Sequence, residues 1–244
     1  MVDVWRLLIS KETDPYLNMA VEEALLEAVE REEVPNTLRL WRSSCSAVVG
    51  LSEKVEETVN LENCRQLQIP VLRRFTGGGT VYIDLGNLNW TFVFRKEREG
   101  QMMSSLSIFE KYSAPIVKAL EDFGVKAKFK PPNALFIGLN KISGMAIYVK
   151  RRSVLCHGTL LINADLNLLK LALKRLKDPV ANLVDESPQK PSVEEVMKLI
   201  LEASEKTLNI KLVEEELSPS EKELTRVNLY NVYEPMRLTN TIKK

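Results

Sequence analysis

The sequence lacks several features that would point to whole classes of function. Its 244 residues carry 34 basic and 33 acidic side chains, whereas a dedicated nucleic-acid binder or a polybasic membrane anchor needs a clear basic excess. No apolar run approaches the ~20 residues that span a bilayer, and the N-terminus shows no basic stretch followed by an apolar one, as a signal peptide would. These absences predict a cytoplasmic protein whose partners are neither nucleic acid nor membrane.

Cysteine and histidine are also scarce. The three cysteines, Cys45, Cys64 and Cys156, are widely spaced and odd in number, which fits neither a disulfide framework nor a zinc site. His157 is the only histidine. The sequence shows no Ser-His-Asp order and no cluster of metal ligands, so it assigns no residue to a metal.

The apolar patterns predict an α+β fold. Helices flank a mixed, mostly antiparallel sheet built from hairpins, without the regular βαβ alternation of a doubly wound fold. Strands are expected at residues 4–9, 37–41, 47–50, 71–74, 80–83, 88–94, 134–137, 141–150 and 154–162, and helices at 14–31, 61–67, 107–123 and 164–177. A further helix should begin at the capping box of Ser192 and Glu195.

The chain is expected to form one unit in two parts. Residues 1–178 hold the predicted sheet, and residues 179–244 form a helical tail that continues the same domain, after a compositional shift near residues 179–191. The last ~40 residues are charged and weakly patterned, with one more helix expected near Ser220.

The most informative segment follows two arginines, Arg73 and Arg74, and contains the three consecutive glycines 77–79. Glycine lets the backbone turn at positive φ and approach a ligand closely, and successive free N–H groups can cradle an anion. An arginine beside such a loop offers a forked donor for phosphate or carboxylate. The segment predicts a site for a phosphorylated or carboxylated small molecule, and the simpler alternative is a glycine-rich hairpin turn.

Two further residues complete the candidate site. Lys141 begins an expected strand, with Gly144 three residues later, and His157 lies in another. Alone, each is more often a surface or core residue than a functional one. No lysine follows the glycines as in a P-loop, and their spacing is not that of dinucleotide-binding folds.

With these segments assembled, the chain resembles the lipoate–protein ligase A family, within the biotin/lipoate ligase and octanoyltransferase superfamily. The resemblance is strongest from Arg73 to Asn89. The other matching segments are residues 6–10, 14–23, 40–41, 48–50, 141–144 and 157–166. The resemblance implies a fold like the catalytic domain of class II biotin and lipoyl ligases.

The resemblance implies ATP-dependent lipoate–protein ligation. The lipoate carboxylate attacks the α-phosphate of ATP, with Mg²⁺ neutralising the phosphates, and pyrophosphate leaves. A lysine ε-amine of a lipoyl-acceptor domain then attacks lipoyl-AMP, and AMP leaves. The acceptor would be an E2 subunit, a glycine-cleavage H protein or a similar carrier.

The resemblance also implies the roles of individual residues. Lys141 would be the catalytic cation, which stabilises charge in both transition states. The residues implied for ATP and phosphate are Arg74, Gly79, Thr80, Val81, Tyr82, Asn87 and Lys141. Those implied for lipoate are Gly77, Gly78, Gly79, Lys141 and His157.

The chain departs from the family at three positions. Ile83 stands where the family usually has histidine, Ala134 where it has aspartate, and Glu53 near a usual glutamine. Many family members also carry a C-terminal accessory domain. We expect none in this chain, so either a separate small polypeptide supplies it or this form works without it.

Two alternatives remain open at this stage. An ATP-independent octanoyl or lipoyl transferase would need a cysteine nucleophile. Cys156 is the only cysteine near the motifs, but neighbours on a strand face opposite sides, so Cys156 should point away from His157. The other alternative is a non-catalytic lipoate-binding paralogue, which the changes at Ile83 and Ala134 suggest.

Overall fold

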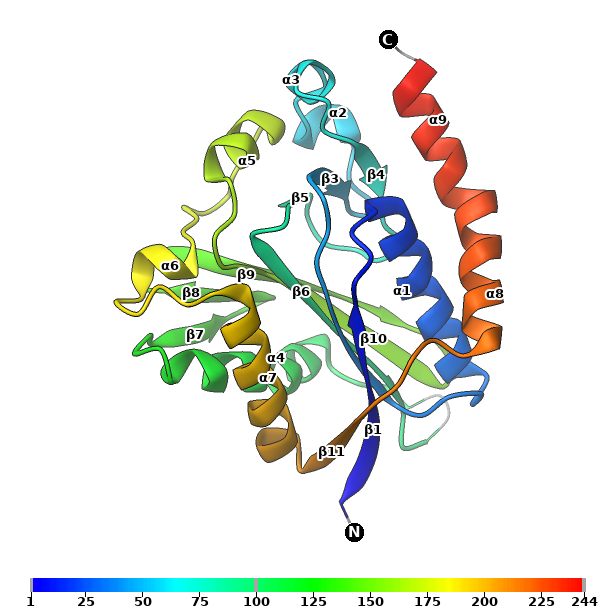
Figure 1. Ribbon diagram of the computed structural model, residues 1–244. Helices are drawn as coiled ribbons and strands as arrows, with labels where there is room; N and C mark the ends of the chain where they lie inside the picture. The colour runs from blue at the N-terminus through cyan, green and yellow to red at the C-terminus, as the bar shows by residue number, and fades with distance from the viewer. Residues whose placement is uncertain (1, 99–100, 243–244) are drawn as a thin grey trace.

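An eight-stranded sheet forms the centre of the computed structural model, which describes residues 2–98 and 101–242 (Figure 1). The strand order is β11-β1-β2-β6-β10-β9-β8-β7. The strands are β1 (Asp3–Ser10), β2 (Thr37–Trp41), β6 (Asn87–Arg95), β7 (Ala127–Lys130), β8 (Ala134–Ile137), β9 (Asn140–Val149), β10 (Ser153–Leu161) and β11 (Ile210–Glu214). Strand β1 pairs parallel with β2 and β11, and the other neighbours are antiparallel. The predicted α+β fold with a mixed, mostly antiparallel sheet is therefore confirmed.

Helices cover both faces of this sheet. Helices α4 (Ser105–Glu121) and α7 (Val193–Leu208) pack on one face, and α1 (Pro15–Glu30) packs on the other. Because side chains alternate along a strand, Trp90 and Phe92 of β6 join the core beneath α4 and α7, while Val93 packs with α1. Each central strand thus contributes to two separate cores.

A second, three-stranded sheet lies beside the first. Its order is β4-β3-β5, formed by β3 (Ser46–Val49), β4 (Val71–Arg73) and β5 (Val81–Ile83). One face packs against the short helices α3 (Leu61–Gln66) and α5 (Leu166–Ala172), with α2 (Val55–Thr58) nearby. The other face packs with α1 and Trp41 of the main sheet, so a cavity can form where the two sheets meet.

Local signals placed most helix starts correctly. The Asp14 carboxylate accepts a hydrogen bond from the Leu17 N–H at the start of α1, and Ser192 and Glu195 form the expected capping box of α7. Helix α5 is shorter than the expected 164–177, because Leu173 leaves it to form an isolated bridge with Val59. The chain then runs to Val180, which forms an isolated bridge with Lys141 of the cavity lining.

The C-terminal part returns to the main sheet. Strand β11, which the sequence analysis missed, pairs with β1, and Leu183 of the short helix α6 (Leu183–Glu186) is fully buried in the main core. The helix expected near Ser220 is α8 (Pro219–Asn228). It lies alongside α1 together with the π-helix η1 (Leu229–Tyr233), and the chain then continues into α9 (Glu234–Ile242), which contacts β4 (Figure 1). Across residues 2–98 and 101–242, no helix is long and apolar enough to cross a bilayer.

Candidate active site

A cavity opens between the two sheets, and Met19 from the N-terminal half of α1 lines it. It encloses about 610 Å³ of space free of atoms, its open mouth included. Its wall combines an apolar cluster of Met19, Trp41, Val48 and Ile83 with several polar side chains. The lining includes Met19, Trp41, Val48, Arg74, Gly79, Thr80, Val81, Ile83, Asn89, Asn133, Lys141, Ala146, His157 and Thr159. Six residues predicted from the sequence therefore meet here: Arg74, Gly79, Thr80, Val81, Lys141 and His157.

Lys141 supplies the positive charge of this cavity. Its backbone is fixed from two sides, since its N–H donates to Pro179 and its carbonyl accepts from Ala181. Within the described part of the chain its ammonium group has no hydrogen-bond or ion-pair partner. Burial lowers the pKa of Lys141, and the negative charge of Asp178 acts in the opposite direction. An unpaired, half-buried cation at a cavity wall is suited to an anionic ligand.

Arg74 lies beneath the glycine loop with only 6% of its surface exposed. Its Nε donates to Thr76 Oγ1 (2.9 Å), and one Nη donates to the carbonyl oxygens of Gly77 (2.6 Å) and Gly79 (2.8 Å). The other Nη donates to the Val48 carbonyl. Burial lowers the pKa of Arg74 to about 10. The guanidinium thus organises the loop backbone at the edge of the cavity.

The glycines of this region serve different purposes. Gly78 has a φ of +82°, and a Cβ at Gly50 would lie 1.9 Å from the Gly78 carbonyl oxygen. Both positions therefore require glycine for the fold itself. Gly77 and Gly79 have no such need, since a Cβ at either would meet no atom within 4 Å. The open space beside these two glycines leaves their backbone accessible to a ligand.

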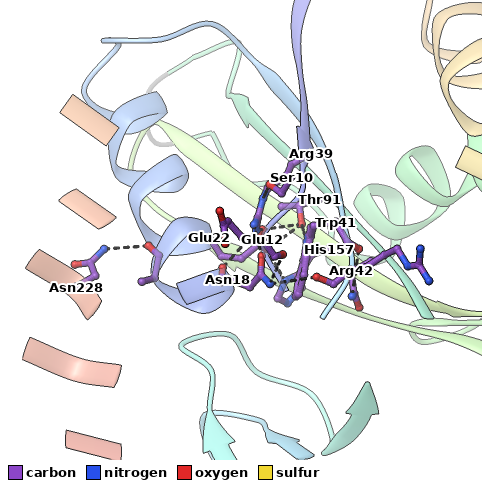
Figure 2. A network of polar contacts seen from close by, with 12 residues as sticks. Ser10, Glu12, Asn18, Glu22, Arg39, Trp41, Arg42, Thr91, His157 and Asn228 are labelled. Carbon is purple, nitrogen blue, oxygen red and sulfur yellow. Dashed lines mark hydrogen bonds and ion pairs between the residues drawn. The ribbon is translucent and has the colours of Figure 1, made fainter. Parts of the chain in front are cut away.

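His157 is held from both ring nitrogens. Its Nδ1 lies 3.0 Å from Glu22 Oε2, and its Nε2 lies 2.9 Å from Thr76 Oγ1. Figure 2 shows the α1 side of this network, where Glu22 also accepts hydrogen bonds from Arg39 (2.7 Å) and from the Thr91 hydroxyl. The ring nitrogens are thereby engaged with the protein, and the rest of the imidazole lines the cavity.

Sequence analysis missed Glu22, Arg39 and Thr91. The sequence indicates no role for Glu22 within the helix expected at residues 14–31, yet Glu22 is fully buried. Burial acts to raise the pKa of Glu22, yet the hydrogen bond with His157 and the charge of Arg39 outweigh it and hold that pKa below its ordinary value. The one available signal was Arg39 between two leucines of β2 and Thr91 between two aromatic residues of β6.

Two predicted residues have side chains outside the cavity lining. Val81 and Ile83 of β5 face the cavity, so the intervening Tyr82 points to the opposite face, where Cys45 donates to its hydroxyl. Asn87 is fully buried and caps the turn before β6 through the N–H of Asp84.

Two of the three departures from the family pattern, Ile83 and Ala134, lie at this cavity or next to one of its lining residues. Ile83 is part of the apolar wall, next to Met19 and Trp41 in one buried cluster. Ala134 is buried on β8, and its neighbour Asn133 donates from Nδ2 to the Met145 carbonyl (2.6 Å). Asn133 thus ties β9 down beside Lys141 without a carboxylate at position 134.

The cysteines lie elsewhere. Cys156 belongs to the core beneath α4 and α7 and is fully buried, on the opposite face of β10 from His157, as the sequence predicts. Burial raises the pKa of the Cys156 thiol. Cys45 and Cys64 belong to the core behind the smaller sheet. Cys156 is therefore placed poorly for the nucleophile of a transferase, and that alternative is not favoured.

The sequence and the fold of this chain are similar to those of known lipoate–protein ligases. Lipoate–protein ligase 1 of Staphylococcus aureus is 35% identical over 201 residues, which cover 78% of this chain and 59% of that protein. The chain spans about half the length of several other curated relatives. A crystal structure of lipoate-protein ligase A bound with ATP aligns with a TM-score of 0.85 at 26% identity and covers 96% of both chains.

A second similar structure is that of a ligase made of two parts. The bipartite lipoate protein ligase of Thermoplasma acidophilum, described with its E2 lipoyl domain, aligns with a TM-score of 0.82 at 26% identity, over 96% of this chain and 94% of that one. Residues 14–205 match the family described as the lipoyl protein ligase A/B catalytic domain. Because this match spans most of the sequence and includes the cavity, the chain belongs to the lipoyl protein ligase A/B catalytic domain family.

Proposed function

We propose that this protein is an ATP-dependent lipoate–protein ligase that activates lipoate as lipoyl-AMP and transfers the lipoyl group to a lysine of an acceptor domain. The observation that carries the proposal is the unpaired ammonium group of Lys141 in a cavity bordered by the glycine loop. Relatives with the same fold are named lipoate ligases, and one structure holds ATP.

The first step joins two anions, and the cavity is built to reduce their repulsion. A lipoate carboxylate oxygen would bond to the α-phosphorus of ATP, and pyrophosphate would leave with the electrons of the broken P–O bond. Lys141 would contact both the carboxylate and the α-phosphate and would stabilise the charge that develops between them. Gly79, Thr80 and Val81 would border the nucleotide, with Tyr82 and Asn87 supporting that strand and turn from behind.

The second step is the attack of a lysine ε-amine on the carbonyl carbon of lipoyl-AMP. The amide bond forms, the C–O bond to phosphate breaks, and AMP leaves while the amine loses a proton. Lys141 would now stabilise the leaving phosphate. The acceptor would be a lipoyl domain such as an E2 subunit or a glycine-cleavage H protein, consistent with the E2 lipoyl domain described with the T. acidophilum ligase.

The acyl chain would pack against the apolar part of the cavity wall. Met19, Trp41 and Ile83 line it, with His157 beside them, and the backbone of Gly77–Gly79 would border the chain near its carboxyl end. Each buried methylene contributes about 0.8 kcal/mol, so this wall can supply much of the affinity.

Mg²⁺ is expected to arrive with ATP. Among the described residues, the cavity lining includes no carboxylate, and no group of three or more potential metal ligands lies together. We therefore assign Mg²⁺ no protein ligand, since nucleotide phosphates commonly hold this ion.

The test is ATP–pyrophosphate exchange with lipoate, measured for the chain alone and with an added accessory-domain polypeptide from a bipartite relative. Exchange by the chain alone supports a ligase that tolerates Ile83 and Ala134. Exchange only with the added polypeptide supports the catalytic subunit of a two-chain ligase. No exchange under either condition contradicts adenylation and favours a lipoate-binding paralogue.

A further inference from the structure

Four buried side chains connect α1 to the glycine loop in an unbroken series. Glu22 Oε2 lies 3.0 Å from His157 Nδ1, His157 Nε2 lies 2.9 Å from Thr76 Oγ1, and Thr76 Oγ1 lies 2.9 Å from Arg74 Nε. Glu22 and Thr76 are fully buried, and Arg74 and His157 expose at most 9% of their surface. The sequence analysis assigned roles to Arg74 and His157 and to neither of the other two.

When the His157 ring is neutral, the carboxylate at one end determines the direction of every hydrogen bond. Ionised Glu22 can only accept, so Nδ1 of His157 must carry the proton that it donates. In the neutral ring Nε2 is then an acceptor, and the Thr76 hydroxyl must donate to it. The Thr76 oxygen keeps its lone pairs for the N–H of Arg74 Nε, which can only donate.

The other end of the series holds the loop that borders the cavity. Arg74 donates from one Nη to the carbonyl oxygens of Gly77 and Gly79. A change in the orientation of the guanidinium would move both carbonyls. Because Gly79 and Lys141 line the same cavity, the path of the loop decides how a ligand meets the ammonium group.

We propose that Glu22 is a positioning residue of the ligation reaction, which fixes His157 as the Nδ1–H tautomer and, through Thr76 and Arg74, fixes the glycine loop beside Lys141. The inference rests on the proposed ligase function. In this proposal His157 connects Glu22 to Thr76 through hydrogen bonds at its two ring nitrogens. Glu22 itself touches neither substrate and acts through this connection.

Glu22→Gln reverses the first hydrogen bond without a change of shape. Arg39 can only donate, so the oxygen of the new side-chain amide must face Arg39 and its nitrogen must face His157. The ring must then accept at Nδ1 and carry its proton on Nε2. Because His157 is the only histidine in the chain, ¹⁵N NMR of uniformly labelled protein reports this tautomer without ambiguity.

We expect the Nδ1–H tautomer in the unmutated protein and the Nε2–H tautomer in Glu22→Gln. Exchange at saturating ATP and lipoate should fall on the order of 10- to 100-fold, since small misplacements near reacting groups have effects of this size. The matched control is Glu23→Gln, the next residue of α1, which contacts Tyr233 instead. It should keep both the tautomer and the exchange rate.

Thr76→Val tests the same series at its centre and leaves the Glu22–Arg39 pair intact. It should reduce exchange by a similar factor while His157 keeps its Nδ1–H tautomer, and the double variant should lose no more than either single one. An Nε2–H tautomer in the unmutated protein overturns the proposal. So does a Glu22→Gln protein with the reversed tautomer and undiminished exchange. The NMR measurement needs no catalytic activity, so failure of the ligase assignment and failure of this connection are distinguishable.

Discussion

The two faces of the main sheet differ in what they bury. Beneath α4 and α7, the central strands contribute apolar side chains such as Trp90, Phe92 and Cys156. On the α1 face near the cavity, the neighbouring positions Thr91 and His157 belong to a buried polar network. The same strands therefore serve stability on one side and the candidate chemistry on the other, because their side chains alternate. Substitutions on the two faces should have separable effects.

The largest expected effect is the loss of activity without loss of stability. Lys141→Ala should lower ATP–pyrophosphate exchange on the order of 10²- to 10³-fold, as removal of a preorganised charge-stabilising group does. Its melting temperature should stay within a few degrees (roughly 1 kcal/mol), since the ammonium group has no partner to lose. Lys128→Ala on the exposed part of β7 is the control and should leave exchange unchanged. Near-normal exchange by Lys141→Ala would remove this residue from the site.

The opposite outcome is expected on the apolar face. Trp90→Ala removes a fully buried indole and should reduce the free energy of unfolding by about 3–5 kcal/mol. Urea denaturation followed by circular dichroism measures this loss. A change below about 1 kcal/mol would show that the neighbouring side chains can fill the space left by the indole. This face would then be less important for stability than its packing indicates.

The polar face should make the free energy of unfolding depend on pH in the acidic range. The folded-state pKa of Glu22 lies below its ordinary value of 4.5, so its contribution is complete above about pH 4.5 and is lost as the pH falls through the folded-state pKa. Between pH 5 and pH 3 the unmutated protein should therefore lose more unfolding free energy than Glu22→Gln. Parallel acid profiles for the two proteins would contradict a depressed pKa at this residue.

Two glycines sharpen the distinction around the glycine loop. Gly50→Ala places a methyl group 1.9 Å from the Gly78 carbonyl oxygen, so the loop must shift, and we expect a loss of about 1–3 kcal/mol in unfolding free energy. Gly79→Ala meets no atom within 4 Å and should keep its stability, while its KM for ATP rises if the backbone borders the nucleotide. Thermal melts and exchange kinetics on both variants decide this, and an unchanged KM for Gly79→Ala would place the nucleotide elsewhere.

The smallest effect is expected for Cys156→Ala. The thiol lies in the apolar core away from the cavity, so exchange should be unchanged and the loss of stability should be about 1 kcal/mol. Mass spectrometry after incubation with an octanoyl carrier protein should find no thioester on this residue. A thioester there would revive the transferase alternative.

The sequence predicted most elements because their signals are local. Asp14 and Ser192 cap helices that begin where expected, and the strands expected at residues 134–137 and 141–150 are present and pair with each other. The glycine loop was found in the same way, through residue types that are unusual in their local setting, whereas the role of Lys141 came from the family resemblance. Strand β11 was missed because Ile210–Glu214 is short and lies in a charged segment.

The polar network could not be predicted for a different reason. It joins positions 22, 39, 91 and 157, which only the three-dimensional fold brings together. Glu22 lies among several glutamates of α1, and nothing local distinguishes this fully buried one from the others, which are partly exposed. Its role follows from register and packing, which depend on the whole chain.

The pairing of β1 with β11 sets an order of events during synthesis. About 200 residues separate the two strands, and at 5–20 residues per second the ribosome needs roughly 10–40 s to make them. Throughout that interval the outer edge of β1 has no strand beside it, and Arg6 has no access to Glu221, its buried partner in the folded protein. An unpaired edge invites pairing with other chains. The N-terminal half of this protein is thus exposed to aggregation until its last quarter has emerged, and chaperones would act in that interval.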